Sequence, residues 1–431
     1  MGLLRNPRAL LEYVRGSLLF APGLSVIVAV AIGLVLSRPE FDLGGSPAPF
    51  FGGGASGAQG LLQAITTAVI TVTTLTFSLT VIALQLASSQ YSPRLLRGFL
   101  RDRGTQAVLS ILLATAAYSL IVLGSIRPPE DPGGESVPEV AVSLAVLLAL
   151  TSIAALVYFL DHVTTEIRVD TMLVKVRDAT GETIRRLFPE KPNNLAPHPT
   201  PEPPEGAAAL IATRSGFLQD ADVDGICELS AQHEVSLLLR PRVGDAVVRG
   251  TPVGWVWPAP GVEALDDLAH LLDQHLTIGF ERTAAQDYAF GFRQLTDVAT
   301  RALSPGVNDP TTARHATVQL THLLCLLAPR PMGDVLIVSA DGRFIRRFPR
   351  QGFAEILEDS VSPLRWYGSQ DVDVASSAFR MLTEVHALCS SSERRSLVRR
   401  QALLLLDSCR QAHSGDDLRR IEELAAPLLT S

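Results

Sequence analysis

The chain has 431 residues, a formal net charge of −7 and a mean hydropathy of +0.25, and only 19% of its residues are charged. This composition excludes a purely soluble protein of this length and favours a membrane protein. The acidic balance also argues against nucleic acid as the main partner.

Four apolar stretches are each long enough to cross the roughly 30 Å hydrocarbon layer of a membrane, which takes about 20 helical residues. They are Ser17–Leu36, Ala64–Ala87, Gln106–Ile126 and Glu139–Leu160. Arginines gather in the amino-terminal arm and after the second stretch, whereas the other two loops are acidic. Because basic residues favour the cytoplasmic side, we predict four transmembrane helices with both termini in the cytoplasm, in a bacterial inner membrane.

The second stretch is unusually rich in hydroxyl side chains, as its part TVTTLTFSLTVIALQLASSQYSP shows. At 100° per residue, six polar side chains fall within about 60° of one another on one helix face. These six are Thr67, Thr71, Thr74, Ser78, Gln85 and Ser89. A second, separate band contains Thr66, Thr73, Thr76 and Thr80. Hydroxyls can join neighbouring membrane helices or bond to their own backbone, so packing is one interpretation. A water-facing wall is the other, and the six residues are then candidates to line a pore.

The end of this helix adds a basic segment to the candidate pore. A helix from about Gly57 to Gln90 would be about 50 Å long and would extend beyond the bilayer. Arg94, Arg97 and Arg101 follow at helical spacing. If copies of the chain surround an axis, these arginines form a positive ring at the inner mouth. The alternative is that they only fix the orientation of the helices in the membrane.

The rest of the chain is predicted to be a cytoplasmic α+β region. Residues 1–188 form the helical membrane domain, in which the fourth helix continues as an amphipathic stalk to about Leu187. A proline-rich linker, 189–205, leads to a small β domain at 206–258. Residues 259–431 are mainly helical, with a hairpin near 335–348 and helices at Val372–Leu388, Ser391–Ala412 and Asp416–Leu429. Within the β domain, RVGDAVVRGTPVGWV resembles barrel-sandwich domains of the biotinyl and lipoyl type, but no lysine follows Lys191, which excludes a carrier role.

The segment Ile278–Ala313 carries a second candidate site. Its periodicity predicts one helix with a charged face formed by Arg282, Gln286, Arg293, Asp297 and Arg301. The last three are four residues apart, which favours ion pairs, and the opposite, core face is formed by Tyr288, Phe292, Leu295 and Ala299. Asp309 before Pro310 is typical of the start of the next helix. A salt-bridged helical elbow is the simplest interpretation. The functional interpretation is contact with a neighbouring subunit or a small anionic ligand. The residues concerned are Arg282, Gln286, Asp287, Arg293, Asp297, Arg301, Asn308 and Asp309.

Three blocks together resemble a known family. They are FSLTVIALQLASSQYSPRLLRGFLRD, the ERTAAQDYAFGFRQLTDVATRALSPGVNDPTTA block and the GFLQ and GDAVVRGTP pieces. Through them the chain resembles the bacterial membrane proteins catalogued as domain of unknown function 2254. The resemblance implies an inner-membrane protein with four membrane helices and a cytoplasmic carboxy-terminal region, and it implies no activity.

Sequence motifs give little support to catalysis. The four cysteines form no C-x-x-C pair, and no P-loop, G-x-S-x-G or H-E-x-x-H occurs. His315 and His322 lie on one predicted helix with no carboxylate beside them. We therefore predict no enzyme, no metal and no cofactor. The leading hypothesis is a homo-oligomeric ion channel whose second helix lines the pore and whose cytoplasmic domain regulates it. The alternative is a non-conducting, membrane-anchored sensor or scaffold, and turnover of a phosphorylated compound is a third, weaker hypothesis. The expected partners are membrane lipid, further copies of the chain and a small anionic ligand.

Overall fold

The computed structural model contains two compact units, Met1–Met172 and Leu173–Ser431. It describes residues 20–38, 53–90, 102–128, 136–166, 168–189, 202–258, 260–284, 286–339, 342 and 344–430.

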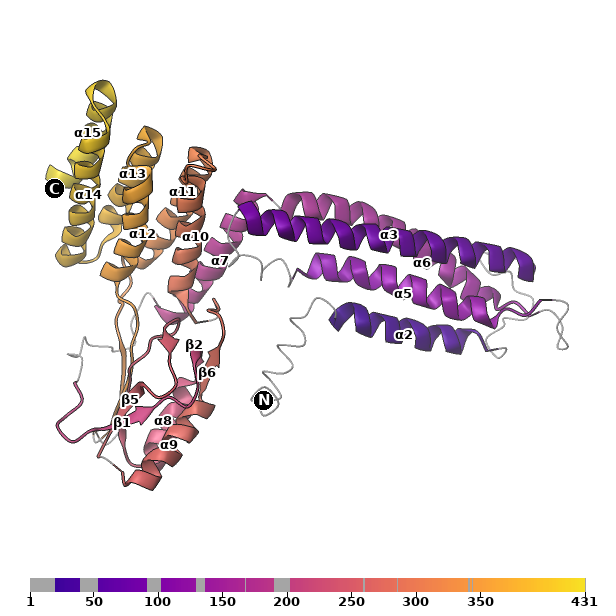
Figure 1. Ribbon diagram of the computed structural model, residues 1–431, viewed down its shortest axis with the longest axis horizontal. Helices are drawn as coiled ribbons and strands as arrows, with labels where there is room; N and C mark the ends of the chain where they lie inside the picture. Colours follow the sequence, from indigo (N-terminus) through magenta and orange to yellow (C-terminus); the bar gives the residue numbers. More distant parts are fainter. Residues whose placement is uncertain are drawn as a thin grey trace. The chain divides into compact units, whose positions relative to one another are not determined.

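The first unit consists of apolar helices that run side by side (Figure 1). They are α2 (Phe20–Leu36), α3 (Ala55–Gln90), α5 (Arg103–Ser125) and α6 (Glu139–Glu166). Among the described residues, three helices, α3, α5 and α6, are long and apolar enough to cross a membrane, and α2 is a shorter apolar helix. The prediction of four full spans is therefore not confirmed. As described, α2 has 17 residues, and at 1.5 Å per residue it covers only about 26 Å.

Helix α5 lies at the centre of this unit and packs against α2, α3 and α6. Gly33 allows α2 to approach closely, because a Cβ atom there would lie 3.1 Å from Cγ2 of Ile121. Two hydroxyls inside the bundle pair across helices: that of Tyr118 donates to the carbonyl of Ala141, and that of Ser152 to Oγ1 of Thr115, each at 3.0 Å. Such pairs are needed because hydrocarbon offers no water to buried polar groups.

The predicted continuous stalk is wrong, since the structure has two helices there. Helix α6 ends at Glu166 and α7 spans Val169–Leu187, with Arg168 outside both. The last turn of α6 contains Thr164, whose hydroxyl donates to the carbonyl of Asp161 at 2.8 Å. The N–H of Arg168 donates to the carbonyl of Thr165, three residues earlier, at 3.3 Å, so the four-residue hydrogen-bond pattern of α6 does not continue into α7.

Most of α7 packs within the second unit. The side chain of Thr180 contacts Gly291, where any Cβ atom would collide with it. Nη1 of Arg177 donates to Oε1 of Gln319 at 3.1 Å. The helix predicted as a membrane stalk is thus held by the segment after residue 173 through specific contacts.

Two small open sheets replace the predicted barrel-sandwich unit. The five-stranded sheet has the order β1 (Ala208–Ile211), β5 (Pro252–Trp257), β3 (Ser236–Leu239), β8 (Ile345–Phe348) and β7 (Val335–Val338). The three-stranded sheet has the order β4 (Ala246–Val247), β2 (Gly216–Ala221) and β6 (Leu276–Gly279). Neither sheet closes among the described residues. The hairpin near 335–348 is confirmed, but β8 pairs in parallel with β3, so it completes a sheet that sequence analysis assigned to 206–258 alone.

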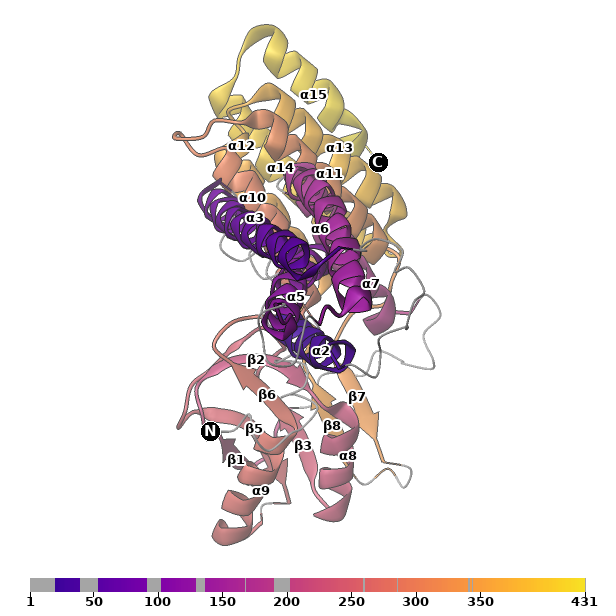
Figure 2. The ribbon, with the colours of Figure 1, turned by 90° about the vertical axis from the view of Figure 1, so that its right-hand side faces the viewer.

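Two helices in this region were not predicted, α8 (Val223–Gln232) and α9 (Val262–Gln274). Figure 2 shows both beside the strands. Helix α8 interrupts the predicted β domain, and its start is fixed by Asp222, whose carboxylate accepts from the N–H of Gly225 at 3.1 Å. In the sequence, the only local sign of α8 is the capping aspartate, and this sign is weak between strand-like segments. A helix this short depends on tertiary packing, which the local sequence does not show.

The remaining helices form three stacked hairpins, α10–α11, α12–α13 and α14–α15 (Figure 1). Their bounds are α10 Tyr288–Ala302, α11 Pro310–Leu327, α12 Phe353–Gly368, α13 Val372–Leu388, α14 Ser392–Ala412 and α15 Gly415–Thr430. Helices α10, α12 and α14 make one layer, and α11, α13 and α15 make the other. The predicted bounds of α13 are confirmed, and those of α14 and α15 agree within one residue at each end.

Candidate functional site

The predicted polar stripe lies on the outer face of α3. Thr67, Thr71, Thr74, Ser78 and Gln85 are all exposed. Ser89 belongs to α3, but its side chain lies outside the described residues, as do Arg94, Arg97 and Arg101. Within the first unit, no other described helix covers the five exposed side chains.

Apolar side chains flank the stripe on both sides. At 100° per residue, Ile70, Phe77 and Val81 lie on one flank, and Leu75 and Leu86 lie on the other. All five of these flanking side chains are exposed. The stripe is therefore a polar strip in the middle of an apolar face, an arrangement that suits contact with further helices on either side.

The stripe hydroxyls bond to their own helix. Thr71 donates to the carbonyl of Thr67 at 2.8 Å, and Ser78 donates to that of Thr74 at 2.9 Å. Thr74 donates in the same way to Ile70 at 3.0 Å. Each donor is thus satisfied without water, and each oxygen keeps its lone pairs to accept a further hydrogen bond.

The second hydroxyl band lies on the opposite, inner face of α3. Thr66, Thr76 and Thr80 are buried, and Thr73 is half-buried. Thr80 donates to the carbonyl of Thr76 at 2.8 Å. The hydroxyls of Thr66 and Thr76 have no hydrogen-bond partner in the part of the chain that the structure describes. The described side chains of the first hydroxyl band of α3 are therefore exposed, whereas the second band is packed inside the helical bundle.

The second predicted site begins before the helix on which sequence analysis placed it. Helix α10 starts at Tyr288, so Arg282 and Gln286 do not share a helix face with Arg293. That part of the prediction is wrong because Asp287 ends the preceding segment as the N-cap of α10. Its carboxylate accepts from the N–H of Phe290 at 3.0 Å.

Arg282 and Asp287 form a largely buried ion pair. Nε and Nη2 of Arg282 donate to the two carboxylate oxygens of Asp287 at 2.7 and 3.0 Å. The Asp287 side chain is 1% exposed and the Arg282 side chain 29%. Burial raises the pKa of the Asp287 carboxyl, although the Arg282 guanidinium acts in the opposite direction. Gly244, at a φ of +99°, packs against this carboxylate, where a Cβ atom would collide.

The remaining elbow residues also have structural partners. Arg293 and Asp297 form the predicted ion pair, with Nε of Arg293 3.0 Å from the carboxylate. Asn308 has a φ of 47° and makes the turn between the helices. Asp309 caps α11 as predicted, and hydrogen bonds from the Thr312 side chain and backbone hold its pKa below the ordinary value. Arg301 likewise has a partner. The structure thus uses the elbow mainly to join α10 to α11.

One polar cluster was missed by sequence reasoning. Asp102 caps α5, and its carboxylate lies 2.7 Å from Nε2 of His162 on α6. A ligand atom of Glu166 lies within 4.8 Å of both, so the three side chains could hold a metal ion. The spacing of His162 and Glu166 by one helical turn was the available signal, but Asp102 comes from another helix. In this structure the pair ties the start of α5 to α6.

The apolar helices of the first unit define a membrane protein, and comparison with known proteins agrees. Residues 15–384 match the family model described as "Predicted membrane protein (DUF2254)". The chain belongs to this family. It is 37% identical over 419 residues to uncharacterised proteins of Mycobacterium bovis and Mycobacterium tuberculosis, covering 96% of this chain and 80% of each relative. No solved structure matches the chain.

Proposed function

We propose that the protein is a homo-oligomeric channel of the bacterial inner membrane, with the outer face of α3 lining the pore. The observation that carries the proposal is the exposed stripe of Thr67, Thr71, Thr74, Ser78 and Gln85. One chain leaves this stripe uncovered within the first unit, so a closed aqueous route requires several copies around an axis.

The flanks of the stripe suit such an assembly. Phe77 on one side and Leu75 on the other, 50% and 53% exposed, would pack against α3 of neighbouring copies. The hydroxyl oxygens between them would then face the axis. Because Thr71, Thr74 and Ser78 already donate their protons to backbone carbonyls, their oxygens would present lone pairs to water.

The proposal also includes the orientation of the chain across the membrane. The arginine-rich segments of the sequence favour a cytoplasmic position for both termini. The unit Leu173–Ser431 would then lie in the cytoplasm and regulate opening. Arg94, Arg97 and Arg101 would form a positive ring at the inner mouth. Membrane lipid and further copies of the chain are the partners that this arrangement needs.

Ion flux through liposomes that contain the purified protein tests the proposal. Wild-type protein should conduct, and the double variant Thr74→Leu with Ser78→Leu should lose most of the flux, because two leucines would make the wall apolar. A matched control places leucines on the exposed face of α6, Ile153→Leu with Val157→Leu, and should keep the flux. Equal flux in wild type and the stripe variant would remove α3 as the lining.

The alternative function is a non-conducting, membrane-anchored sensor or scaffold. The observation that favours it is the local bonding of the stripe, since hydroxyls that donate to their own helix can face lipid or another helix at little cost. In this case the wild-type protein gives no flux, and the stripe variant differs from it only in the association of subunits.

A further inference from the structure

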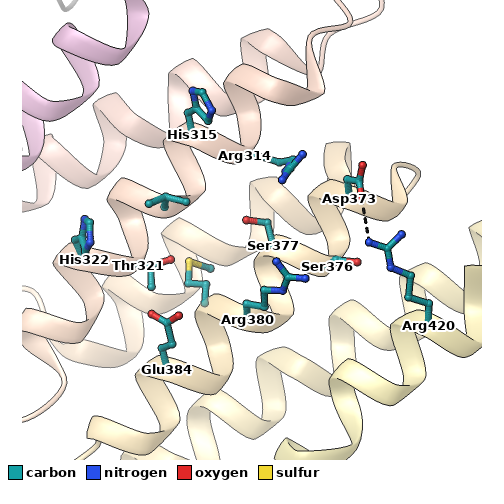
Figure 3. A pocket seen from close by; sticks show the side chains of 12 residues that line it. Arg314, His315, Thr321, His322, Asp373, Ser376, Ser377, Arg380, Glu384 and Arg420 are labelled. Atoms are coloured by element: carbon teal, nitrogen blue, oxygen red, sulfur yellow. Dashed lines mark hydrogen bonds and ion pairs between the residues drawn. The ribbon is translucent and has the colours of Figure 1, made fainter.

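A cavity of about 410 Å³ opens on the layer formed by α11, α13 and α15 (Figure 3). Small-molecule sites in proteins have volumes of about 300–1,000 Å³. The cavity belongs to the second unit, and its lining contains none of the elbow residues that sequence analysis selected. Its lining residues have no part in the proposed pore.

Arginines dominate one end of this cavity. Arg314 of α11 and Arg380 of α13 line it from facing helices, and neither has an ion-pair partner among the described residues. Arg420 of α15 lies at the same end but is paired with Asp373 at 3.3 Å. Figure 3 shows the three guanidinium groups around Ser376 and Ser377. Two guanidinium groups without carboxylate partners therefore remain to bind an anion.

A buried hydroxyl gives an independent sign of a ligand. Ser376 lines the cavity and is only 3% exposed, yet its Oγ has no hydrogen-bond partner among the described residues. Other helical hydroxyls nearby are satisfied, such as that of Thr321, which donates to the carbonyl of Thr317 at 2.8 Å. A buried hydroxyl is normally paired, and one that faces an arginine-lined cavity is placed to donate to an anion.

The other end of the cavity is lined by a histidine, a carboxylate and apolar side chains. His322 of α11 faces Glu384 of α13 there (Figure 3). Val318 and Met381 supply the apolar surface of the lining. A ligand that fits the whole cavity would carry a negative group at one end and a body with hydrogen-bonding groups at the other.

We infer that this cavity binds a small phosphorylated molecule. Its phosphate lies between Arg314 and Arg380 and accepts a hydrogen bond from Ser376, and its body extends toward His322 and Glu384. Arginine suits phosphate because its planar fork of N–H donors matches two phosphate oxygens. A soluble nucleotide and a phospholipid headgroup share this chemistry. The inference concerns the second unit alone and holds whether or not the protein conducts ions.

Thermal unfolding of the full-length protein in detergent tests the inference. Pyrophosphate, ATP and a short-chain phosphatidylglycerol serve as probes, each compared with sodium chloride at equal ionic strength. A bound ligand raises the melting temperature progressively with its concentration. The strongest effect from ATP identifies a soluble nucleotide, and the strongest effect from phosphatidylglycerol identifies a lipid headgroup. No rise with any phosphate probe would overturn the inference.

Two variants and a control locate the site. Arg380→Ala should weaken binding roughly tenfold or more, because it removes a hydrogen bond to a charged group. Ser376→Ala should weaken binding about two- to tenfold while leaving the unliganded protein at least as stable, since the lost hydroxyl has no partner in the fold. Arg400, an exposed arginine of α14 outside the cavity, provides the control, and Arg400→Ala should bind as wild type does. Undiminished binding in both cavity variants would overturn the site.

Discussion

The outer face of α3 and the segment Ile278–Ala313 were both candidate functional sites, and their polar side chains have different surroundings in the structure. On α3 the stripe residues Thr71, Thr74 and Ser78 stay exposed. At the elbow the charged residues turn toward each other, and Arg282 closes over the buried carboxylate of Asp287. One predicted site remains open to a partner, and the other is used by the fold.

The chemistry of the side chains explains this difference. A hydroxyl on a helix can donate to the carbonyl four residues earlier, so its exposure or burial costs little. A carboxylate or guanidinium has no such local partner and is costly to bury alone, so the fold pairs it. A helical spacing of hydroxyl residues therefore predicts which side chains share a helix face. The same spacing of charged residues predicts only that they will form ion pairs, and not which partners they choose.

The largest expected effect is at the elbow. Asp287→Ala leaves the Arg282 guanidinium without its partner and removes the cap of α10, so the free energy of unfolding should fall by about 3 kcal/mol. Arg293→Ala, which breaks an exposed pair on the same helix, should cost about 0.5 kcal/mol. Thermal or denaturant unfolding of the full chain in detergent measures both. Similar losses of unfolding free energy in the two variants would show that the buried Arg282–Asp287 pair stabilises the fold no more than the exposed Arg293–Asp297 pair does.

The two hydroxyl bands of α3 should respond differently to the same substitution. Thr76 is fully buried on the inner face, so Thr76→Leu overfills the bundle and should cost about 1–3 kcal/mol. Thr74→Leu adds the same atoms on the exposed face and should leave the melting temperature of the single chain almost unchanged. A large loss of stability in Thr74→Leu would place that residue in a packed interface.

A smaller effect, dependent on pH, should appear at Asp309. This carboxylate caps α11, so Asp309→Ala should cost about 1 kcal/mol at neutral pH. Hydrogen bonds from Thr312 hold its pKa below the ordinary value in the folded protein. The contribution of the Asp309 carboxylate to the free energy of unfolding is therefore complete above the ordinary aspartate pKa of about 3.9. It is lost as the pH falls through the lower pKa that this group has in the folded protein. Wild type and variant should converge in stability in acid, and a constant difference would contradict this role.

Sequence analysis predicted those features that depend on local pattern. Helix α13 has the predicted bounds, and the core face of α10 is buried through Tyr288, Phe292, Leu295 and Ala299. The cap at Asp309 is also confirmed. Each of these follows from residues within a few positions of one another.

Features that depend on distant segments were missed. The strand β8 pairs with β3, which comes about a hundred residues earlier, and register between such segments leaves no local signal. Ser376 and Arg314 lie on different helices of one layer, so neither marked a cavity in the sequence. Asp102 and His162 are separated by 60 residues, which include the whole of α5. Tertiary packing, which no periodicity encodes, brings these groups together.

The central claim is that water meets the outer face of α3, and its most direct test is cysteine accessibility. Cys227, Cys325, Cys389 and Cys409 are first replaced, and single cysteines are then placed at stripe and flank positions of the protein in liposomes. A membrane-impermeant maleimide should label Thr74→Cys and Ser78→Cys many times faster than Leu75→Cys and Phe77→Cys. Equally slow labelling at all four positions would show that the stripe meets lipid or protein, and would contradict the proposed pore.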